Sequence, residues 1–370
     1  MTAARTPNLL TPFTACAALL MACSSGSSEA PPPPPPPPAG DVELDFSAVR
    51  SAVDAFEVDD VVILIGDETG VLYRYEKGLL RSSDAYLVAS ASKMVSGLGV
   101  WRLIESGDLS RDDAPQDHLF FWETGEAAGR SGVTLNHLLG FVSGFNNPPD
   151  EPECIGDGVS SLLECVMSIH DGGIDGAPGT AFYYGPEHLQ IAALVAVEAT
   201  GATDFGALLR ERLFDPAGVS ASTGFSPLSG DNPRYAGGLI SSANDFGLIL
   251  HGVLAGALVA DLPSYLEDRT ASASFGFRPS TVDANDLDWH YGAGFWIECD
   301  APVFESACLT NPTISSPGAF GFTPWIDFEA GYWGVIAMQE FAAQAFSPSE
   351  ASVLLEQELQ PLIETALSGG

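Results

Sequence analysis

The chain has 370 residues, 46% of them hydrophobic, and 49 acidic against 14 basic residues give a net charge of −35. The hydrophobic content supports a sizeable core and argues against wholesale disorder, and the length allows one large domain or two small ones. The negative charge excludes a surface for nucleic acid or anionic lipid head groups and favours a monomer.

The beginning of the chain has the composition of an export signal. Residues 13–22, FTACAALLMA, form an apolar run that is too short to span a bilayer. The run ends in Leu20-Met21-Ala22-Cys23, which resembles the lipobox of bacterial lipoproteins. We therefore predict a signal peptide over 1–22 and lipidation of Cys23. An ordinary secretory signal with an incidental cysteine is the alternative.

A tether is expected over residues 23–40, because a Ser/Gly-rich stretch is followed there by eight prolines, Pro31 to Pro38. A proline run adopts an extended helix of ~3.1 Å per residue, which makes it a stiff spacer of roughly 25 Å. We expect a lipid anchor in a bacterial membrane and a single domain, residues 41–370, held in the periplasm or at the cell surface.

Four cysteines follow the tether: Cys154, Cys165, Cys299 and Cys308. Export leads to an oxidising compartment, where an even number of cysteines indicates disulfides. Three pairings are possible, and the short spacings favour Cys154–Cys165 and Cys299–Cys308. Metal binding is the alternative, but no CxxC pair or histidine cluster supports it. We expect no metal and no other cofactor.

The first half of the domain is predicted to begin with a helix and a hairpin. Helical periodicity favours a helix over 46–56. Alternating residues on either side of a Gly-containing turn favour a hairpin over 61–78. Residues 95–105 are apolar over much of a helical surface, which predicts a buried helix. A second buried helix is expected over 245–262, too short and too interrupted to span a membrane.

The last part of the chain returns to strands. Three strands are predicted, over 291–298, 319–327 and 332–340, and a helix over 349–367 with Ser347 or Ser349 as its cap. Strands at both chain ends with helices between them predict an α+β fold. We expect an antiparallel sheet built from the two chain ends and an inserted all-helical lobe.

Ser90 and Lys93 are the first candidates for chemistry. Ser90 lies at the expected start of a helix, where free N–H groups give a partial positive charge. Lys93, one of two lysines in the chain, follows three residues later on the same face. Burial disfavours a charged lysine, and a neutral amine beside a serine can accept the hydroxyl proton.

The S-x-x-K pattern alone is weak, because chance gives it in roughly one such chain in five. Ser90 could be only a helix N-cap, and Lys93 could extend to solvent. The other lysine, Lys77, lies in an expected surface turn beside Gly78, which makes a lysine at the head of a buried helix the less ordinary placement.

The surrounding segments resemble the serine β-lactamase and penicillin-binding protein superfamily, and in particular its class C β-lactamases, DD-peptidases and related esterases. Segments similar to that family's motifs occur in the family's order over nearly all of residues 45–365. They read ASASKMVSGLGVWRLIESGDLSRDD, VTLNHLLGFVSGF, PGTAFYYGPEHLQIAALVAVEATG, RLFDPAGVSAST, RYAGGLISSANDFGLIL, HYGAGFWIE and SSPGAFGFTPWID.

The resemblance implies a β-lactamase/transpeptidase-like fold and a role for each matching residue. Ser90 would be the acylated nucleophile, Lys93 its proton partner, and Tyr184 the shared general base that later protonates the leaving group. Tyr183 is the rival in that alignment, and an aromatic pair that only fills the core is the plain alternative. The backbone N–H groups of Ser90 and Ala319 would form the oxyanion hole.

Three departures from the family's motifs bear on the substrate. Pro186 stands where Y-x-N has asparagine, Ser316 where the third motif has lysine or histidine, and Phe141 where HTSG has histidine. Ser316 and Gly318 would line the substrate site, but without a clamp for a substrate carboxylate. This predicts poor binding of penicillins and D-Ala-D-Ala peptides, and cleavage of esters or simple acyl compounds.

Several further residues receive plainer interpretations. Phe320, Phe322 and Trp325 could form an acyl pocket, although strand core is the favoured reading. His188 could reach the site, but a helix-surface histidine is the default. Asp245 lacks the G-x-S-x-G elbow of a Ser-His-Asp enzyme. We expect a helical position for His137 and a structural or solvated Asp327.

The sequence therefore predicts an exported serine hydrolase that works through an acyl-enzyme on Ser90 and takes a small acyl substrate. Two alternatives stay open. One is a β-lactamase or D-Ala-D-Ala peptidase. The other is a non-catalytic binding or sensor module with the same fold, which Pro186 and Ser316 favour.

Overall fold

The computed structural model describes residues 44–122, 129–145, 152–155, 157–225, 231–283, 285–299, 301–341 and 347–369. The predicted signal peptide, the lipidation site Cys23 and the proline tether lie outside the described residues. They stay predictions.

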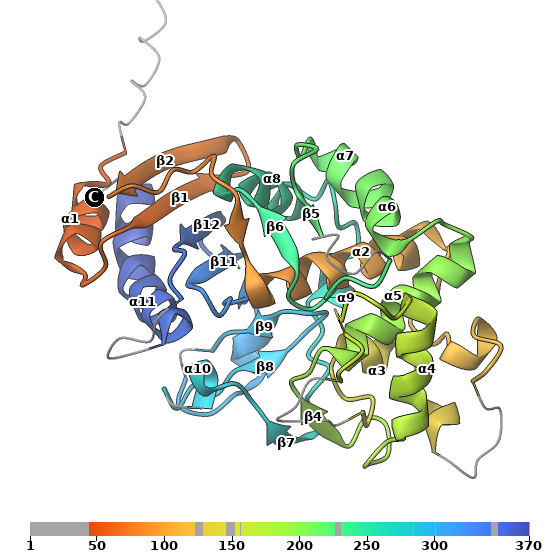
Figure 1. The fold of residues 1–370 in the computed structure, drawn as a ribbon. Helices are drawn as coiled ribbons and strands as arrows, with labels where there is room; N and C mark the ends of the chain where they lie inside the picture. The colour runs from red at the N-terminus through yellow and green to blue at the C-terminus, as the bar shows by residue number, and fades with distance from the viewer. Residues whose placement is uncertain are drawn as a thin grey trace, which may run out of the picture. The chain divides into compact units, whose positions relative to one another are not determined.

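A seven-stranded antiparallel sheet is built from both ends of the chain, as predicted (Figure 1). Its strand order is β2-β1-β12-β11-β10-β9-β8. The strands are β1 (Val61–Asp67), β2 (Gly70–Lys77), β8 (His290–Tyr291), β9 (Trp296–Ile297), β10 (Thr313–Ser315), β11 (Phe322–Asp327) and β12 (Tyr332–Ala337).

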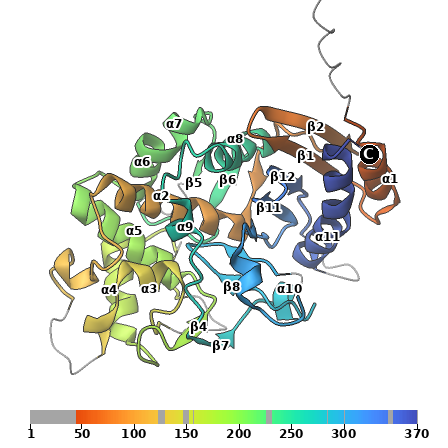
Figure 2. The ribbon, with the colours of Figure 1, turned by 180° about the vertical axis from the view of Figure 1, so that it is seen from behind.

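Strand β1 is apolar along its length because the sheet is covered on both faces. Val61, Ile63 and Ile65 pack with α1 (Ser47–Ala55) and α11 (Pro348–Leu367). The alternate residues Val62 and Leu64 join the larger core on the other face. Figures 1 and 2 both show α1 and α11 side by side on the outer face of the sheet. The Ser347 side chain caps α11, one of the two predicted caps.

The inserted segment forms the predicted helical lobe (Figure 2). Its longer helices are α2 (Ser92–Ser106), α4 (Leu162–Gly172) and α5 (Glu187–Thr200), whereas α8 (Ala243–Leu254) packs against β1, β11 and β12 of the large sheet. The shorter helices are α3 (Leu135–Leu139), α6 (Phe205–Leu209), α7 (Asp215–Ala217), α9 (Leu262–Tyr265) and α10 (Ser280–Asp283). Two small sheets were not predicted. They consist of β3 (Tyr86–Leu87), β6 (Leu239–Ser241) and β5 (Gly224–Phe225), and of β4 (Ala181–Tyr183) parallel to β7 (Ser274–Phe277).

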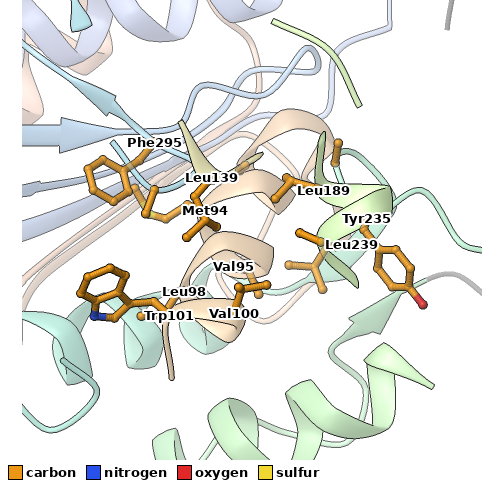
Figure 3. Close-up of a cluster of buried hydrophobic side chains, with 14 of the residues drawn as sticks. Met94, Val95, Leu98, Val100, Trp101, Leu139, Leu189, Tyr235, Leu239 and Phe295 are labelled. Atoms are coloured by element: carbon orange, nitrogen blue, oxygen red, sulfur yellow. The ribbon is translucent and has the colours of Figure 1, made fainter. Parts of the chain in front are cut away.

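Helix α2 lies at the centre of the larger core, surrounded by side chains from other elements (Figure 3). Met94, Val95 and Leu98 pack there among residues such as Leu139 of α3 and Leu189 of α5. The helix also approaches the β8–β9 turn at backbone distance, because a Cβ at Gly97 would lie 2.1 Å from the Ala293 carbonyl oxygen. The prediction of a buried helix is confirmed.

Two predicted elements differ from the structure. The strand expected over 291–298 is a hairpin, β8 and β9, whose turn contains Gly294 in the left-handed region at φ 84°. The helix expected over 245–262 ends at Leu254, and Gly256 at φ 70° prevents its continuation. In both places glycine supplies a backbone conformation that apolar periodicity does not reveal.

Lys77 also differs from its predicted setting in a surface turn. It is the last residue of β2 and is partly buried. Its Nζ donates to the carbonyl oxygens of Val53, Asp54 and Phe56, at the C-terminal end of α1. A cation there satisfies the free carbonyls of a helix end and its partial negative charge. Lys77 is therefore held in place by the end of α1 and does not extend freely from a surface turn.

The disulfides join Cys154 to Cys165 and Cys299 to Cys308, the pairing that the spacings favour. Their Cα atoms are 5.2 and 5.1 Å apart. Among the described residues no single helix is long and apolar enough to cross a membrane. The bent pair Glu187–Thr200 and Phe205–Ala217 meets that test only when its members are taken together.

Candidate active site

Ser90 lies on a short 3-10 turn, Ala89–Ala91, immediately before α2. It does not cap the helix, because the N-cap position belongs to Ala91 and carries no side-chain bond. Ala89, just before it, has a left-handed backbone at φ 47°, which costs a non-glycine residue about 1–2 kcal/mol. The Ser90 side chain is partly exposed at this strained turn.

Lys93 lies beneath Ser90 rather than in solvent, with 5% of its surface exposed. Its Nζ is 3.0 Å from Ser90 Oγ and 2.8 Å from the Ala236 carbonyl oxygen. Because the amine can donate to Ala236 with one N–H, its lone pair is available to the Ser90 hydroxyl whenever it is neutral. The idea that Lys93 extends to solvent is wrong.

Tyr184, which follows β4, completes the group around Ser90. Its phenol hydrogen-bonds to the Ser90 side chain, and burial raises its pKa well above the usual value of 10. The Lys93 Nζ lies 4.5 Å from the centre of the Tyr184 ring, close enough for a cation–π contact. Tyr183 instead packs against Gly276, where a Cβ would lie 2.7 Å from its hydroxyl. The structure brings Tyr184 to the serine.

The segment after β10 lies directly against the Ser90 turn. The Ser316 Oγ donates to the Ser90 carbonyl oxygen at 3.0 Å. Gly318 approaches Val88 so closely that a Cβ there would lie 2.2 Å from the Val88 carbonyl oxygen. Because the Ser316 hydroxyl bonds to the protein itself, a direct contact of Ser316 or Gly318 with substrate stays a prediction.

The two predicted oxyanion donors are the backbone amides of Ser90 and Ala319. Ala319 is exposed, and Ser90 is partly so. Neither N–H donates to a backbone carbonyl in the described part of the chain, whereas the neighbouring Gly318 N–H donates to Phe322 O at 2.8 Å. Both amides therefore remain available for a developing negative charge. Their role in catalysis stays a prediction.

Two of the residues that depart from the family's motifs, Pro186 and Phe141, bring apolar side chains to the surroundings of Tyr184. Pro186 occupies the N-cap position of α5 without a side-chain bond. Phe141 is fully buried, and its ring lies 5.9 Å from that of Tyr184. The Tyr184 ring also stacks on Trp296, with centroids 5.5 Å apart and an interplanar angle of 18°. The aromatic rings of Phe141 and Trp296 thus lie on the sides of the Tyr184 ring.

The remaining candidates lie where packing requires them. Phe322 and Trp325 are fully buried strand core, as favoured, while Phe320 is half-buried against Phe341 with centroids 4.9 Å apart. His137 is on α3, as expected. Asp245 accepts hydrogen bonds from Ser220 and Thr223, and Asp327 accepts from the backbone of the turn at 329–330. Neither aspartate contacts Ser90.

The expectation of a surface position for His188 is wrong, because the side chain is fully buried on α5. Its Nδ1 lies 2.8 Å from Ser143 Oγ, and its Nε2 lies 2.9 Å from the Tyr183 carbonyl oxygen. The available signal was the composition of α5, since a helix that is apolar on all sides is buried on all sides.

The Ala236 carbonyl is a second feature that sequence reasoning missed. The segment that carries it is fixed to α2 by two bonds, from Ser96 Oγ to Tyr235 O at 2.7 Å and from Leu239 N to Ser92 Oγ at 3.0 Å. A backbone acceptor leaves no trace in a side-chain pattern. The similarity of residues 234–250 to a family motif was the one hint that this segment mattered.

No group of three or more His, Cys, Asp or Glu side chains within the described ranges could hold a metal ion. The serine, the buried amine, the phenol and the two amides are the groups from which the chemistry of this site can be built.

The family model named Beta-lactamase matches residues 57–357. The match covers most of the chain, and the protein belongs to this family. The fold is accordingly that of the serine β-lactamases and penicillin-binding proteins, as the motifs predicted.

Among curated proteins, a 154-residue segment is 27% identical to penicillin-binding protein 4 of Amycolatopsis lactamdurans. That match covers 42% of this chain and 40% of the relative. A candidate beta-lactamase from Bacteroides dorei DSM 17855 has a similar structure, with a TM-score of 0.70 and 23% identity over 88% of this chain and 99% of that one. EstCE1, a hydrolase with promiscuous acyltransferase activity, also has a similar structure. Its TM-score is 0.63, and the two sequences are 17% identical over 86% of this chain and 96% of that one. At these identities the two structures establish the fold alone.

Proposed function

We propose that this member of the Beta-lactamase family is an exported serine hydrolase that cleaves esters or simple acyl compounds through an acyl-enzyme on Ser90. One observation carries the proposal. The Ser90 Oγ lies 3.0 Å from a buried amine and also bonds to a buried phenol. A hydroxyl placed between two proton-transfer groups is the arrangement that nucleophilic catalysis requires.

The proton transfers follow from the pKa values. Tyr184 keeps its proton near neutral pH, because burial raises its pKa. Lys93, when its amine is in the neutral form, is therefore the group that accepts the Ser90 proton as the Ser90 oxygen bonds to the substrate carbonyl carbon. The Tyr184 phenol donates its proton to the leaving oxygen as the ester bond breaks, and Lys93 returns a proton to the phenolate. Water then attacks the acyl-enzyme by the reverse route and releases the acid.

The negative charge that appears on the carbonyl oxygen would be stabilised by the N–H groups of Ser90 and Ala319. Removing one such donor from an enzyme typically costs 10²–10³ in kcat. The close approach of Gly318 to Val88 keeps the two segments together. The geometry of this hole is set by the backbone, so the identity of the side chain at 319 has little influence on it.

The proposed substrate class follows from what the site lacks. Ser316 bonds to Ser90, and Pro186 has no side-chain donor. No cationic side chain stands at either motif position to pair with the carboxylate of a penicillin or a D-Ala-D-Ala peptide. The aromatic surroundings of Tyr184 favour an uncharged acyl group. EstCE1, the structural neighbour described as a hydrolase with promiscuous acyltransferase activity, is consistent with this choice.

The test compares p-nitrophenyl acetate and butyrate with nitrocefin, using wild type and Ser90→Ala. We expect wild type to hydrolyse the esters and Ser90→Ala to lose the activity, with nitrocefin turnover at least 100-fold slower in kcat/KM than that of the better ester. Nitrocefin hydrolysis at a rate that matches the esters would contradict the proposed substrate class. Absence of hydrolysis of every substrate would contradict the enzyme.

A β-lactamase or peptidase is the second candidate, and the similarity to a penicillin-binding protein over 42% of the chain favours it. The nitrocefin measurement decides between the two. The proposed anchor is tested separately, by metabolic labelling of the full chain with a palmitate analogue in a bacterial host. Labelling of wild type that disappears in Cys23→Ala supports lipidation, and labelling of neither protein contradicts it.

A further inference from the structure

His188 is a fully buried histidine that the proposed acyl chemistry does not use. It is the second residue of α5, four positions after Tyr184. Its two ring nitrogens have defined partners: Ser143 Oγ at 2.8 Å from Nδ1, and the Tyr183 carbonyl oxygen at 2.9 Å from Nε2. Because both ring nitrogens are hydrogen-bonded, the buried imidazole is held in one orientation.

The direction of these bonds follows from their partners. The Tyr183 carbonyl oxygen can only accept, so Nε2 carries the proton. Burial is the main cause that lowers the pKa of His188 to about 4, with Lys93 contributing in the same direction. The ring is therefore neutral near pH 7. The Nδ1 atom of a neutral ring accepts, so the Ser143 hydroxyl donates to it. The Tyr183 carbonyl thus selects this tautomer, and the Ser143 hydroxyl satisfies its Nδ1 atom.

The carbonyl that His188 holds belongs to the peptide unit that joins Tyr183 to Tyr184. The N–H of the same unit, on Tyr184, donates to the Phe277 carbonyl oxygen at 3.0 Å. Both polar ends of this peptide plane are therefore fixed, one by a side chain and the other by β7. The Tyr184 side chain leaves the backbone directly from this plane, so the plane's orientation decides where the phenol lies.

The ring of His188 also supports the aromatic group around Tyr184. It stacks on Phe141 with centroids 4.6 Å apart and an interplanar angle of 18°. Phe141 lies 5.9 Å from the Tyr184 ring and accepts the Tyr183 N–H on its carbonyl oxygen at 3.0 Å. Phe141 itself has a left-handed backbone, at φ 57°. His188 therefore contacts Phe141 with the face of its ring and the Tyr183 carbonyl oxygen with Nε2.

We propose that His188 is a positioning residue for Tyr184, and that Ser143 anchors the His188 ring through its bond to Nδ1. The inference rests on the proposed role of Tyr184 in acyl transfer. His188 contacts neither Ser90 nor a substrate in this arrangement. Its effect passes through the Tyr183–Tyr184 peptide to the phenol, whose displacement by about 1 Å could cost on the order of 100-fold in rate.

The variants follow from the two bonds. In His188→Gln the amide nitrogen replaces Nε2 and can still donate to Tyr183, whereas His188→Leu removes the donor at similar volume. Ser143→Ala removes the hydroxyl but leaves the ring. His170→Leu is the matched control, because His170 is also buried, at 5% exposure, and lies on α4 away from Ser90. Thermal melting of each variant reports on folding.

The measurement is kcat and KM for p-nitrophenyl acetate, together with the rate at which a fluorophosphonate probe labels Ser90. We expect His188→Leu to lower kcat 10- to 100-fold with KM within about twofold. The kcat of His188→Gln should be close to that of wild type. The kcat of Ser143→Ala should lie between those of His188→Leu and His188→Gln, and His170→Leu should keep the wild-type kcat.

The decisive comparison repeats His188→Leu in a Tyr184→Phe background. If His188 acts through the phenol, the substitution has little further effect on the labelling rate there. An equal loss in both backgrounds would overturn the proposal, as would a wild-type kcat in His188→Leu. If His188→Leu fails to fold, a His188→Gln variant that folds but loses as much kcat as Tyr184→Phe would overturn it. A wild type that neither hydrolyses the ester nor labels would overturn the proposed function, and this inference with it.

Discussion

The Ser316 Oγ donates a hydrogen bond to the backbone carbonyl oxygen of Ser90 at 3.0 Å. The bond joins the end of β10 to the turn that carries the proposed nucleophile. It acts on a backbone in which the preceding residue, Ala89, is left-handed. Strain of this kind persists only where surrounding contacts hold it. Ser316, which is predicted to line the substrate site, thus also holds the turn that carries Ser90.

Ser316→Ala should lower kcat for p-nitrophenyl acetate about fivefold, because a bond worth about 1 kcal/mol no longer holds the Ser90 turn. Ser315→Ala is the matched control. Ser315 is the adjacent buried serine, and its hydroxyl has no hydrogen-bond partner within the described residues. The control should keep wild-type kcat. Equal activities for the two variants would show that the bond to Ser90 has no influence on catalysis.

The two lysines provide a second matched comparison. Lys93→Met and Tyr184→Phe should each lower kcat by about 10²–10⁴, since each removes a proton-transfer group next to Ser90 Oγ. Lys77→Met should keep kcat but lower the melting temperature, because Lys77 binds the carbonyls at the end of α1. Stopped-flow or steady-state ester hydrolysis measures the first effect and thermal melting the second. Near-wild-type kcat in Lys93→Met or Tyr184→Phe would remove that residue from the mechanism.

Gly318 should not tolerate a side chain. A Cβ there would lie 2.2 Å from the Val88 carbonyl oxygen and 3.1 Å from that of Phe322, and both atoms are backbone. Gly318→Ala must therefore separate β10 from the Ser90 turn, with loss of ester hydrolysis and a lower melting temperature. Gly172→Ala at the end of α4 has nothing within 4 Å of the added Cβ. It should leave both measurements unchanged. An active, stable Gly318→Ala would mean that the segments are not held together here.

The buried His188 should make folding sensitive to acid. Burial lowers the pKa of His188 from 6.5 to about 4, with Lys93 on α2 acting in the same direction. Between these two values the unfolded chain binds a proton at 188 that the folded chain does not bind. Stability is therefore fully present above about pH 6.5 and falls as the pH falls toward 4, by roughly 2 kcal/mol between pH 7 and 4.5.

Denaturant unfolding at pH 7 and 4.5 measures this effect in wild type and in His188→Gln, which has no titrating group at 188. Contributions from all other ionisable groups are shared by the two proteins. Wild type should lose about 2 kcal/mol more than the variant over this interval. The same loss in both proteins would mean that His188 is neutral in the unfolded chain as well, or charged in both states.

The sequence predicts the framework of this protein because its signals are local. The hairpin of β1 and β2 follows from alternation around a Gly-containing turn, and the disulfides follow from short spacings. The pairing of the two chain ends in one sheet follows from strands at both ends of the sequence. The Ser90–Lys93 contact follows from a spacing of three residues on one helical turn, and the structure places the two atoms 3.0 Å apart.

The parts that were not predicted depend on tertiary contacts and on backbone atoms. The hairpin of β8 and β9 replaces one strand because Gly294 turns the chain back. His188 is buried because α5 packs on all sides, and the local pattern cannot say what its ring contacts. The Ala236 carbonyl that binds Lys93 and the bond from Ser316 to Ser90 join residues 143 and 226 positions apart. A local sequence pattern cannot reveal contacts between residues so far apart in the chain.

The central claim is that Ser90 is a nucleophile that forms a covalent acyl-type adduct. Intact-mass measurement of the full chain after treatment with a fluorophosphonate probe tests it most directly, with Ser90→Ala and Lys93→Met as companions. We predict one probe molecule per chain in wild type, located at Ser90 by peptide mapping, none in Ser90→Ala, and labelling slowed by orders of magnitude in Lys93→Met. A wild-type protein that takes up no probe, or a Ser90→Ala variant that labels as fast as wild type, would contradict the account.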